Sequence, residues 1–229
     1  MVERTELVDE KKEHTYRSWT ELQDELRLRE LIALARQSAE LRNFRMEKNM
    51  SKEEIEDYVG DILVQMPNHR WLEFTFDNFE ELHKKGVYER FLLRALTGCR
   101  GNNHRWSAWD IELMLDIADR NKLMEAGDPL PGSGPFTVYR GVAGKGPARR
   151  LRGISWTSDF DKAVWFARRF ERFLNKPMVY ETVVQREQVL AYNNSRNESE
   201  FLCLIPKDQK LRRVWSNKAE KESEIKQAA

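Results

Sequence analysis

The sequence predicts an α+β protein in which a helical segment precedes a segment that forms a sheet. Three observations support this fold class. Apolar residues recur at helical spacing through the first half of the 229-residue chain, the turn-rich stretch GDPLPGSGP follows at 127–135, and short alternating stretches come after it. We expect a helical domain over residues 1–130, a sheet-containing domain over 131–215 and a charged, flexible tail over 216–229.

Each helix expected in the first half carries a start or a stop signal. Three starts have an acid three residues after a capping side chain, at Ser18/Glu21, Ser51/Glu54 and Asp77/Glu80. Pro67 ends the second of these helices, and the stretch WLEFTF at 71–76 is compatible with either a short strand or a helix start. Further helices are expected over 87–96, which stops at Gly98, and over 107–126.

The second half is expected to contain five short strands and one helix. Alternating or apolar runs predict the strands, at 136–142, 153–159, 177–184, 188–194 and 200–205. The stretch DKAVWFARRFERFL predicts the helix at 161–174, and Asp159 or Asp161 is its candidate N-cap.

Composition favours a protein of a reducing, cytoplasmic compartment. Charged residues make up 34% of the chain, the mean hydropathy is −0.74, and no apolar stretch is long enough to cross a bilayer. Cys99 and Cys203 have no partner motif, which favours reduced, buried thiols. Because the four histidines show no ligand spacing, we expect no metal. Because no apolar stretch could span a bilayer, we also expect no membrane partner.

The small net charge of +1 hides an asymmetry between the two halves. Residues 1–134 carry 20 Lys and Arg against 27 Asp and Glu, a net charge of −7, whereas residues 135–215 carry 16 against 8, a net charge of +8. The basic half is suited either to an anionic ligand or to attraction by the acidic half.

Three polar clusters stand on three strands of the basic half. Arg140 lies in VYRG, Ser155 and Thr157 lie two apart in SWTS, and Glu198 and Glu200 lie two apart in ESE. Side chains two apart on a strand project to the same face. Two acids on one face repel each other unless a cation or a substrate engages them, so this pair calls for a partner.

This ordered pattern resembles the R-S-E class of mono-ADP-ribosyltransferases, over about residues 136–205. The class has an aromatic-Arg strand, a Ser-Thr-Ser strand and a Glu-x-Glu strand, and the segment GISWTSDFDKAVWFARRF resembles its compact phage and bacterial members. Trp156 replaces a small hydroxyl residue, and the stretch from Arg140 to Ser155 is shorter than in many toxins. The resemblance implies a compact split-β-sheet ADP-ribosyltransferase core that binds NAD as co-substrate.

The resemblance also implies a role for each residue of the pattern. Glu200 would bind the nicotinamide-ribose hydroxyl and stabilise the developing cation, Glu198 would activate the acceptor nitrogen, and Ser155 would orient the catalytic carboxylate. Arg140 would hold the pyrophosphate, for which a planar guanidinium suits better than Lys. The expected cofactor-binding residues are Arg140, Ser155, Thr157, Tyr139 and Gly141.

The expected activity is transfer of ADP-ribose from NAD to a macromolecular acceptor. Protein arginine is slightly favoured over nucleic acid, and the resemblance implies a phage or toxin-system effector. NAD glycohydrolysis and a catalytically silent interaction module are the alternatives. The helical domain would supply the adenine wall or dock a neutralising partner. Secondary candidates are stacking aromatics and a target-contact loop, at Trp156, Trp165, Phe166, Tyr192 and Asn193.

Overall fold

The computed structural model describes residues 19–45, 50–98, 106–146, 151–169 and 174–217, which form eight α-helices and one six-stranded sheet. Seven helices precede the sheet, at α1 (Trp19–Asn43), α2 (Lys52–Val64), α3 (Trp71–Asp77), α4 (Phe79–Lys85), α5 (Tyr88–Gly98), α6 (Ala108–Ile117) and α7 (Arg120–Ala126). The remaining elements are β1 (Phe136–Val142), β2 (Ser155–Thr157), α8 (Phe160–Arg168), β3 (Met178–Val184), β4 (Val189–Asn193), β5 (Glu200–Cys203) and β6 (Arg212–Ser216). The α+β class, with helices before the sheet, is therefore confirmed.

The helix boundaries confirm some of the expected caps and correct others. Ser51 forms the predicted capping box with Glu54, whereas Ser18 lies outside the described residues. Asp77 is the last residue of α3 and caps nothing, because WLEFTF continues as helix up to that residue. The helix start after it has Asn78 in the N-cap position with no side-chain cap.

The helix expected over 107–126 is two helices. Ser107 starts α6 with a capping box to Asp110. The Asp119 side chain then accepts hydrogen bonds from the backbone N–H groups of Asn121 and Lys122, which starts α7. The Asp119 N–H donates to the buried carboxylate of Glu89 at 2.9 Å. An internal N-cap held by tertiary contact thus interrupts a continuous apolar pattern.

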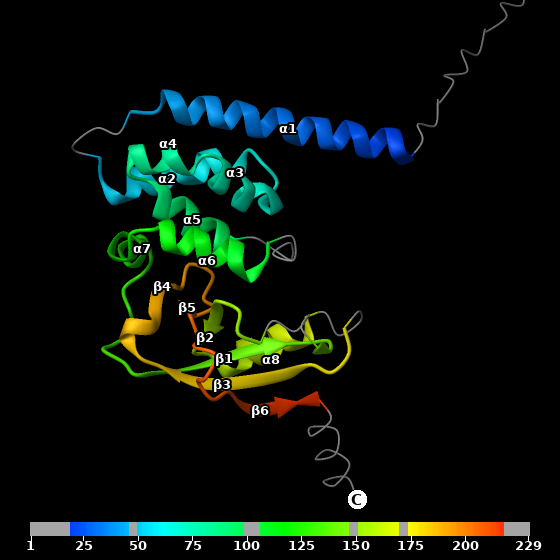
Figure 1. Ribbon diagram of the computed structural model, residues 1–229, viewed down its shortest axis with the longest axis vertical. Coiled ribbons are helices and arrows are strands. Elements are labelled where there is room, and N and C mark those ends of the chain that lie inside the picture. The colour runs from blue at the N-terminus through cyan, green and yellow to red at the C-terminus, as the bar shows by residue number, and fades with distance from the viewer. Residues whose placement is uncertain (1–18, 46–49, 99–105, 147–150, 170–173, 218–229) are drawn as a thin grey trace, which may run out of the picture.

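The helices stack in layers above one end of the sheet, with the long α1 lying outermost (Figure 1). Its helically spaced leucines are mostly exposed: Leu41 is fully buried, whereas Leu22, Leu26 and Leu31 are 39 to 50% exposed. The buried core of the helical part includes Leu190, Ala191 and Leu202 from β4 and β5. The helical part and the sheet therefore share one continuous core at this end.

All hydrogen-bonded pairs of the sheet are antiparallel, and the strand order is β4-β5-β2-β1-β3-β6. β1 and β2 are joined at the single register pair Tyr139–Thr157. The sixth strand was not expected, because two arginines precede Val214 and Trp215 and obscure the alternation. Such charges are typical of an edge strand, which is where β6 pairs with β3.

The two faces of the sheet are covered differently. Trp156, Phe201 and Val138 belong to a second buried core, whereas α8 packs against β1 on the other face. None of the helices within the described ranges is both long and apolar enough to cross a membrane.

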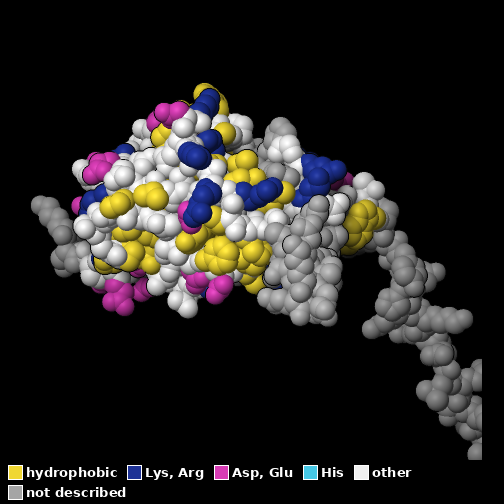
Figure 2. All heavy atoms as spheres, turned by 90° about the horizontal axis from the view of Figure 1, so that it is seen from below, with side chains coloured by type: hydrophobic (Ala, Val, Ile, Leu, Met, Phe, Trp, Pro, Cys, Tyr) yellow, Lys and Arg dark blue, Asp and Glu magenta, His cyan; other side chains and the backbone are white. Residues whose placement is uncertain are grey.

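The side of the molecule opposite the helical layers is rich in cations. Figure 2 shows Lys and Arg side chains running across this surface between apolar patches, with acidic side chains mostly at its margins. This arrangement agrees with the net charge of +8 calculated for residues 135–215.

Candidate functional site

Strand register brings the predicted hydroxyl and carboxyl residues onto one face of the sheet. Thr157 lies directly opposite Glu200, and Ser155 opposite Leu202. Opposed residues in an antiparallel pair project to the same face, as do residues two apart on one strand. Ser155, Thr157 and Glu200 are therefore neighbours, although 45 residues separate the first from the last.

The centre of the site is a hydrogen bond between Ser155 and Glu200. The Ser155 hydroxyl donates to Glu200 Oε1 at 2.5 Å, and the Glu200 residue is only 8% exposed. Burial raises the pKa of Glu200 to about 7, and the nearby Glu198 carboxylate also raises it. The Ser155 hydrogen bond and the positive charges of Arg196 and Arg140 act in the opposite direction.

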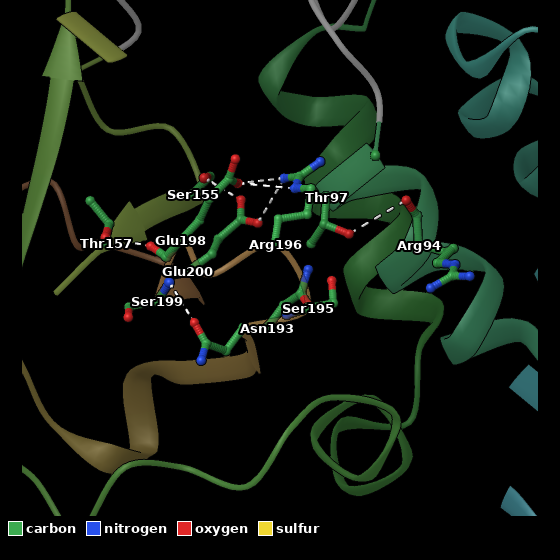
Figure 3. A network of polar contacts seen from close by, with 12 residues as sticks. Arg94, Thr97, Ser155, Thr157, Asn193, Ser195, Arg196, Glu198, Ser199 and Glu200 are labelled. Atoms are coloured by element: carbon green, nitrogen blue, oxygen red, sulfur yellow. Dashed lines mark hydrogen bonds and ion pairs between the residues drawn. The ribbon is translucent and has the colours of Figure 1, made fainter. Parts of the chain in front are cut away.

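The second acid lies nearer to solvent and is paired with a cation that the sequence analysis did not single out. Arg196 Nη2 lies 2.7 Å from Glu198 Oε2 and 3.5 Å from Glu200 Oε2, and its Nε also donates to Glu198 Oε2 at 3.1 Å. Figure 3 shows this side chain beside both glutamates, with dashed lines that run to each carboxylate. One arginine therefore relieves the repulsion that the Glu-x-Glu spacing creates.

The loop that carries Arg196 and Glu198 is held in a defined shape. Asn194 Oδ1 accepts a hydrogen bond from the Ser199 N–H at 3.0 Å, and the Asn194 N–H donates to Asp128 at 2.6 Å. Asn197 and Ser199 have positive φ angles of 54° and 45°. Such conformations cost about 1 kcal/mol or more for non-glycine residues, so this loop stores strain directly before β5.

Thr157 supports this loop from the neighbouring strand. Its hydroxyl donates to the Glu198 carbonyl oxygen at 2.6 Å and accepts from the Asp159 N–H at 3.0 Å. Asp159 in turn is the N-cap of α8 and accepts from the Lys162 N–H. The Ser-x-Thr motif therefore positions both acids, Glu200 through a side chain and Glu198 through its backbone.

Arg140 reaches the site differently from the other residues. It follows Tyr139 on β1 and therefore starts from the face of Val138, opposite the face that carries Thr157 and Glu200. Its Nη1 donates to the Ser155 carbonyl oxygen, and a Cβ on Gly153 would lie 2.2 Å from its Nη2. Arg140 thus lies where β1 and β2 diverge, and it holds the strand that carries Ser155. Its role in binding a pyrophosphate stays a prediction.

Tyr139 and Gly141 share the face of Thr157, but their observed contacts are with α8. The Tyr139 ring makes an edge contact with Phe160 at 5.4 Å between centroids. A Cβ on Gly141 would lie 2.0 Å from the Ala163 carbonyl oxygen, so only glycine allows α8 to approach β1 this closely. Packing accounts for both residues of the VYRG motif that flank Arg140.

The secondary aromatic candidates divide between core and surface. Trp156 is 1% exposed and Tyr192 is 7% exposed, so both pack in the core and Tyr192 is not available to contact a target. Trp165 is 54% exposed on α8 and contacts the Phe166 ring at 5.1 Å. Asn193 remains near the loop surface, where its side chain accepts from the Ser195 N–H.

The helical part borders the site at the loop between β4 and β5. Figure 3 shows the end of α5, with Thr97 and Arg94, beside the loop that carries Ser195 and Arg196. Residues of α2, α5 and this loop line a pocket of about 210 Å³, whose charged members are Lys52, Glu56, Arg90, Arg94 and Asp128. These contacts lie at the loop of Asn193 and Ser195, which was expected to contact the target. The expectation that the helical domain forms an adenine wall therefore stays a prediction.

The other reactive groups carry no second chemistry. Burial raises the pKa of the Cys203 thiol to about 12, so this buried thiol stays protonated at neutral pH, and Cys99 lies outside the described residues. Among the described residues, no cluster of three or more His, Cys, Asp and Glu side chains could hold a metal ion.

The site combines a buried acid with a pKa near neutrality, a hydroxyl that orients it, a second acid nearer to solvent and an arginine that contacts both acids. Perturbed acids in such a setting are typical of functional sites. Searches with protein-family models, curated proteins and solved structures found nothing that matches this chain.

Proposed function

We propose that the protein is a mono-ADP-ribosyltransferase that cleaves NAD and transfers ADP-ribose to a guanidinium of protein arginine. In this proposal, the sheet is a compact ADP-ribosyltransferase core of the split-β-sheet type. The observation that carries the proposal is the 2.5 Å bond from Ser155 to the buried Glu200, with Glu198 two residues away at the protein surface.

The donor half of the reaction needs a carboxylate beside a developing cation. Cleavage of the nicotinamide N-glycosidic bond passes through an oxocarbenium-like state with positive charge on the ribose. Glu200 would stabilise this charge from a site of low dielectric, where such an interaction is strongest. Ser155 holds one oxygen of the carboxylate, which leaves the other oxygen for a ribose hydroxyl once Arg196 moves away.

The acceptor half needs a base near the same carbon. Glu198 is 20% exposed at its side chain, against 10% for Glu200, so it lies closer to an incoming acceptor. The way Glu198 binds Arg196 favours arginine over nucleic acid as the acceptor, because this carboxylate already accepts two hydrogen bonds from a guanidinium. A nucleic-acid acceptor would instead rely on the cations of the sheet half.

The test is incubation of the purified protein and a bacterial lysate with NAD labelled on its adenylate. Label in the protein fraction, released by a hydrolase specific for arginine linkages, is the expected result. Nicotinamide release is measured in parallel. Glu200→Gln should lower the release by about 100-fold or more, because it removes the charge that stabilises the transition state. Glu187→Gln is the matched control, since Glu187 is exposed in the 3-10 turn Arg186–Gln188.

Other outcomes separate the alternatives. Label in the nucleic-acid fraction alone would overturn the arginine acceptor. Free ADP-ribose without a labelled macromolecule would show a glycohydrolase. No nicotinamide release with any acceptor, together with an unchanged signal in Glu200→Gln, would show that the site is catalytically silent.

A further inference from the structure

The structure contains a guanidinium at the position where the proposed reaction requires an acceptor. Arg196 Nη2 is the atom that contacts both carboxylates, at 2.7 Å from Glu198 Oε2 and 3.5 Å from Glu200 Oε2. In the proposed mechanism, Glu200 holds the ribose hydroxyl next to the anomeric carbon, and Glu198 takes the acceptor proton. A nitrogen between these two groups lies close to the carbon that it must attack.

We propose that Arg196 is itself a modification site, which the enzyme ADP-ribosylates within the same chain. This inference rests on the proposed function. It deepens that function by identifying a guanidinium flanked by short polar residues, in the sequence NNSRNES, as an acceptor that the site accommodates.

The step balances without a further reactant. The bond between the ribose anomeric carbon and the nicotinamide nitrogen breaks, and nicotinamide leaves with the electron pair. Arg196 Nη2 forms the new carbon–nitrogen bond and gives one proton to Glu198, which passes it to water. Because Arg196 is attached to the loop that positions it, its effective concentration far exceeds that of any free acceptor.

Local geometry favours Arg196 over the other cations of the chain. The left-handed residue Asn197 lies between Arg196 and Glu198, whose side chains meet at 2.7 Å, and the left-handed Ser199 joins Glu198 to Glu200. The Arg196 side chain is 35% exposed, so its 3.5 Å contact with Glu200 can give way to the ribose hydroxyl while its two hydrogen bonds to Glu198 remain. The contact with Glu200 is the longer of the two and the contact with Glu198 is kept, so this exchange costs little.

Arg212 provides an internal comparison. It binds Glu181 through Nε and Nη2 at 3.1 and 2.6 Å, much as Arg196 binds Glu198, and its side chain is 68% exposed. It lies on β6, at the opposite edge of the sheet from β4 and β5. If exposure or an acidic neighbour alone decided modification, Arg212 would be modified at least as readily as Arg196.

The experiment uses the full chain with NAD and no lysate. After digestion, tandem mass spectrometry locates ADP-ribose, and nicotinamide release is measured in the same samples. We expect a single ADP-ribosyl group on Arg196, none on Arg212, and a rate per chain that does not change when the protein is diluted. Glu198→Gln should lower the ratio of label on Arg196 to released nicotinamide by about 100-fold, the scale of general-base catalysis.

The outcomes distinguish this inference from the proposed function. Nicotinamide release with Arg196 unmodified overturns the inference and leaves the enzyme assignment standing. Label on Arg196 whose rate per chain rises with protein concentration overturns the intramolecular step. No nicotinamide release, with or without lysate, refutes both.

Discussion

Replacing Glu200 by glutamine should stabilise the folded protein while it removes the proposed activity. The pKa of Glu200 is raised from 4.5 to about 7 by burial. One pKa unit corresponds to about 1.4 kcal/mol, so the ionised side chain costs the folded state about 3 kcal/mol above pH 7. The contact with Arg196 is already contained in this shift, because it lowers the pKa of Glu200, so the expected net gain for Glu200→Gln is about 3 kcal/mol.

The sign of the effect depends on pH in a defined way. A carboxyl whose pKa is higher in the folded state keeps its proton there while the unfolded chain loses it. Its contribution to stability is therefore fully present below pH 4.5 and is lost as pH rises to about 7. The difference in unfolding free energy between Glu200→Gln and the wild type should be close to zero at pH 4 and reach its full value by pH 8.

Urea denaturation of both proteins across this pH range, followed by circular dichroism, measures the difference directly. Glu187→Gln is the control and should show no comparable pH-dependent gain, because this side chain is exposed. A Glu200→Gln variant that is as stable as the wild type at pH 8, or less stable, would refute the claim that burial dominates the energetics of this carboxyl.

Three further substitutions test the hydrogen bond to Glu200, the packing of α8 on β1 and the space beside Gly60 in α2. Ser155→Ala removes the hydroxyl that lowers the pKa of Glu200, so the acid limb of the pH profile for nicotinamide release should move up by about one pH unit, and an unmoved limb would contradict this role. Gly141→Ala places a Cβ 2.0 Å from the Ala163 carbonyl oxygen and should lower the unfolding free energy by about 3 kcal/mol, or prevent folding. Gly60→Ala, within α2, meets only the end of a flexible arginine at 3.4 Å and should raise the unfolding free energy by about 0.5 to 1 kcal/mol; a loss of stability would show that the space there is not open.

The order of the elements could be predicted because local signals dominate it. The Ser51 capping box, the stop at Gly98 and the turn-rich stretch at 127–135 each act within a few residues. The break at Asp119 could not be predicted, because it depends on the Glu89 carboxylate 30 residues away. The strand β6 was missed for a related reason, since its pairing with β3 and not its own pattern defines it.

The site divides in the same way between local and non-local determinants. Period-two spacing was enough to place Ser155 with Thr157 on one face of β2. It does not place Glu198, which was expected on the strand of Glu200 but lies in the loop before β5, where Ser199 has a positive φ angle. Alternation along β1 also places the side chains of Tyr139 and Arg140 on opposite faces of the sheet. Which of these faces carries the site is known only from the register pair Tyr139–Thr157. Register depends on pairing across the sheet, which a single strand does not encode.

Arg196 shows how the charge of the site is balanced before any substrate binds. Two acids of this spacing need a cation, and the chain supplies one from four residues before Glu200, at a place where its side chain stays 35% exposed. A buried arginine would bind the acids so firmly that removing it would cost several kcal/mol, and the site would be closed. An exposed arginine neutralises Glu198 and Glu200 at a cost of displacement of about 1 kcal/mol or less. In the proposed mechanism, Arg196 would thus keep the two carboxylates in place until the substrate displaces it.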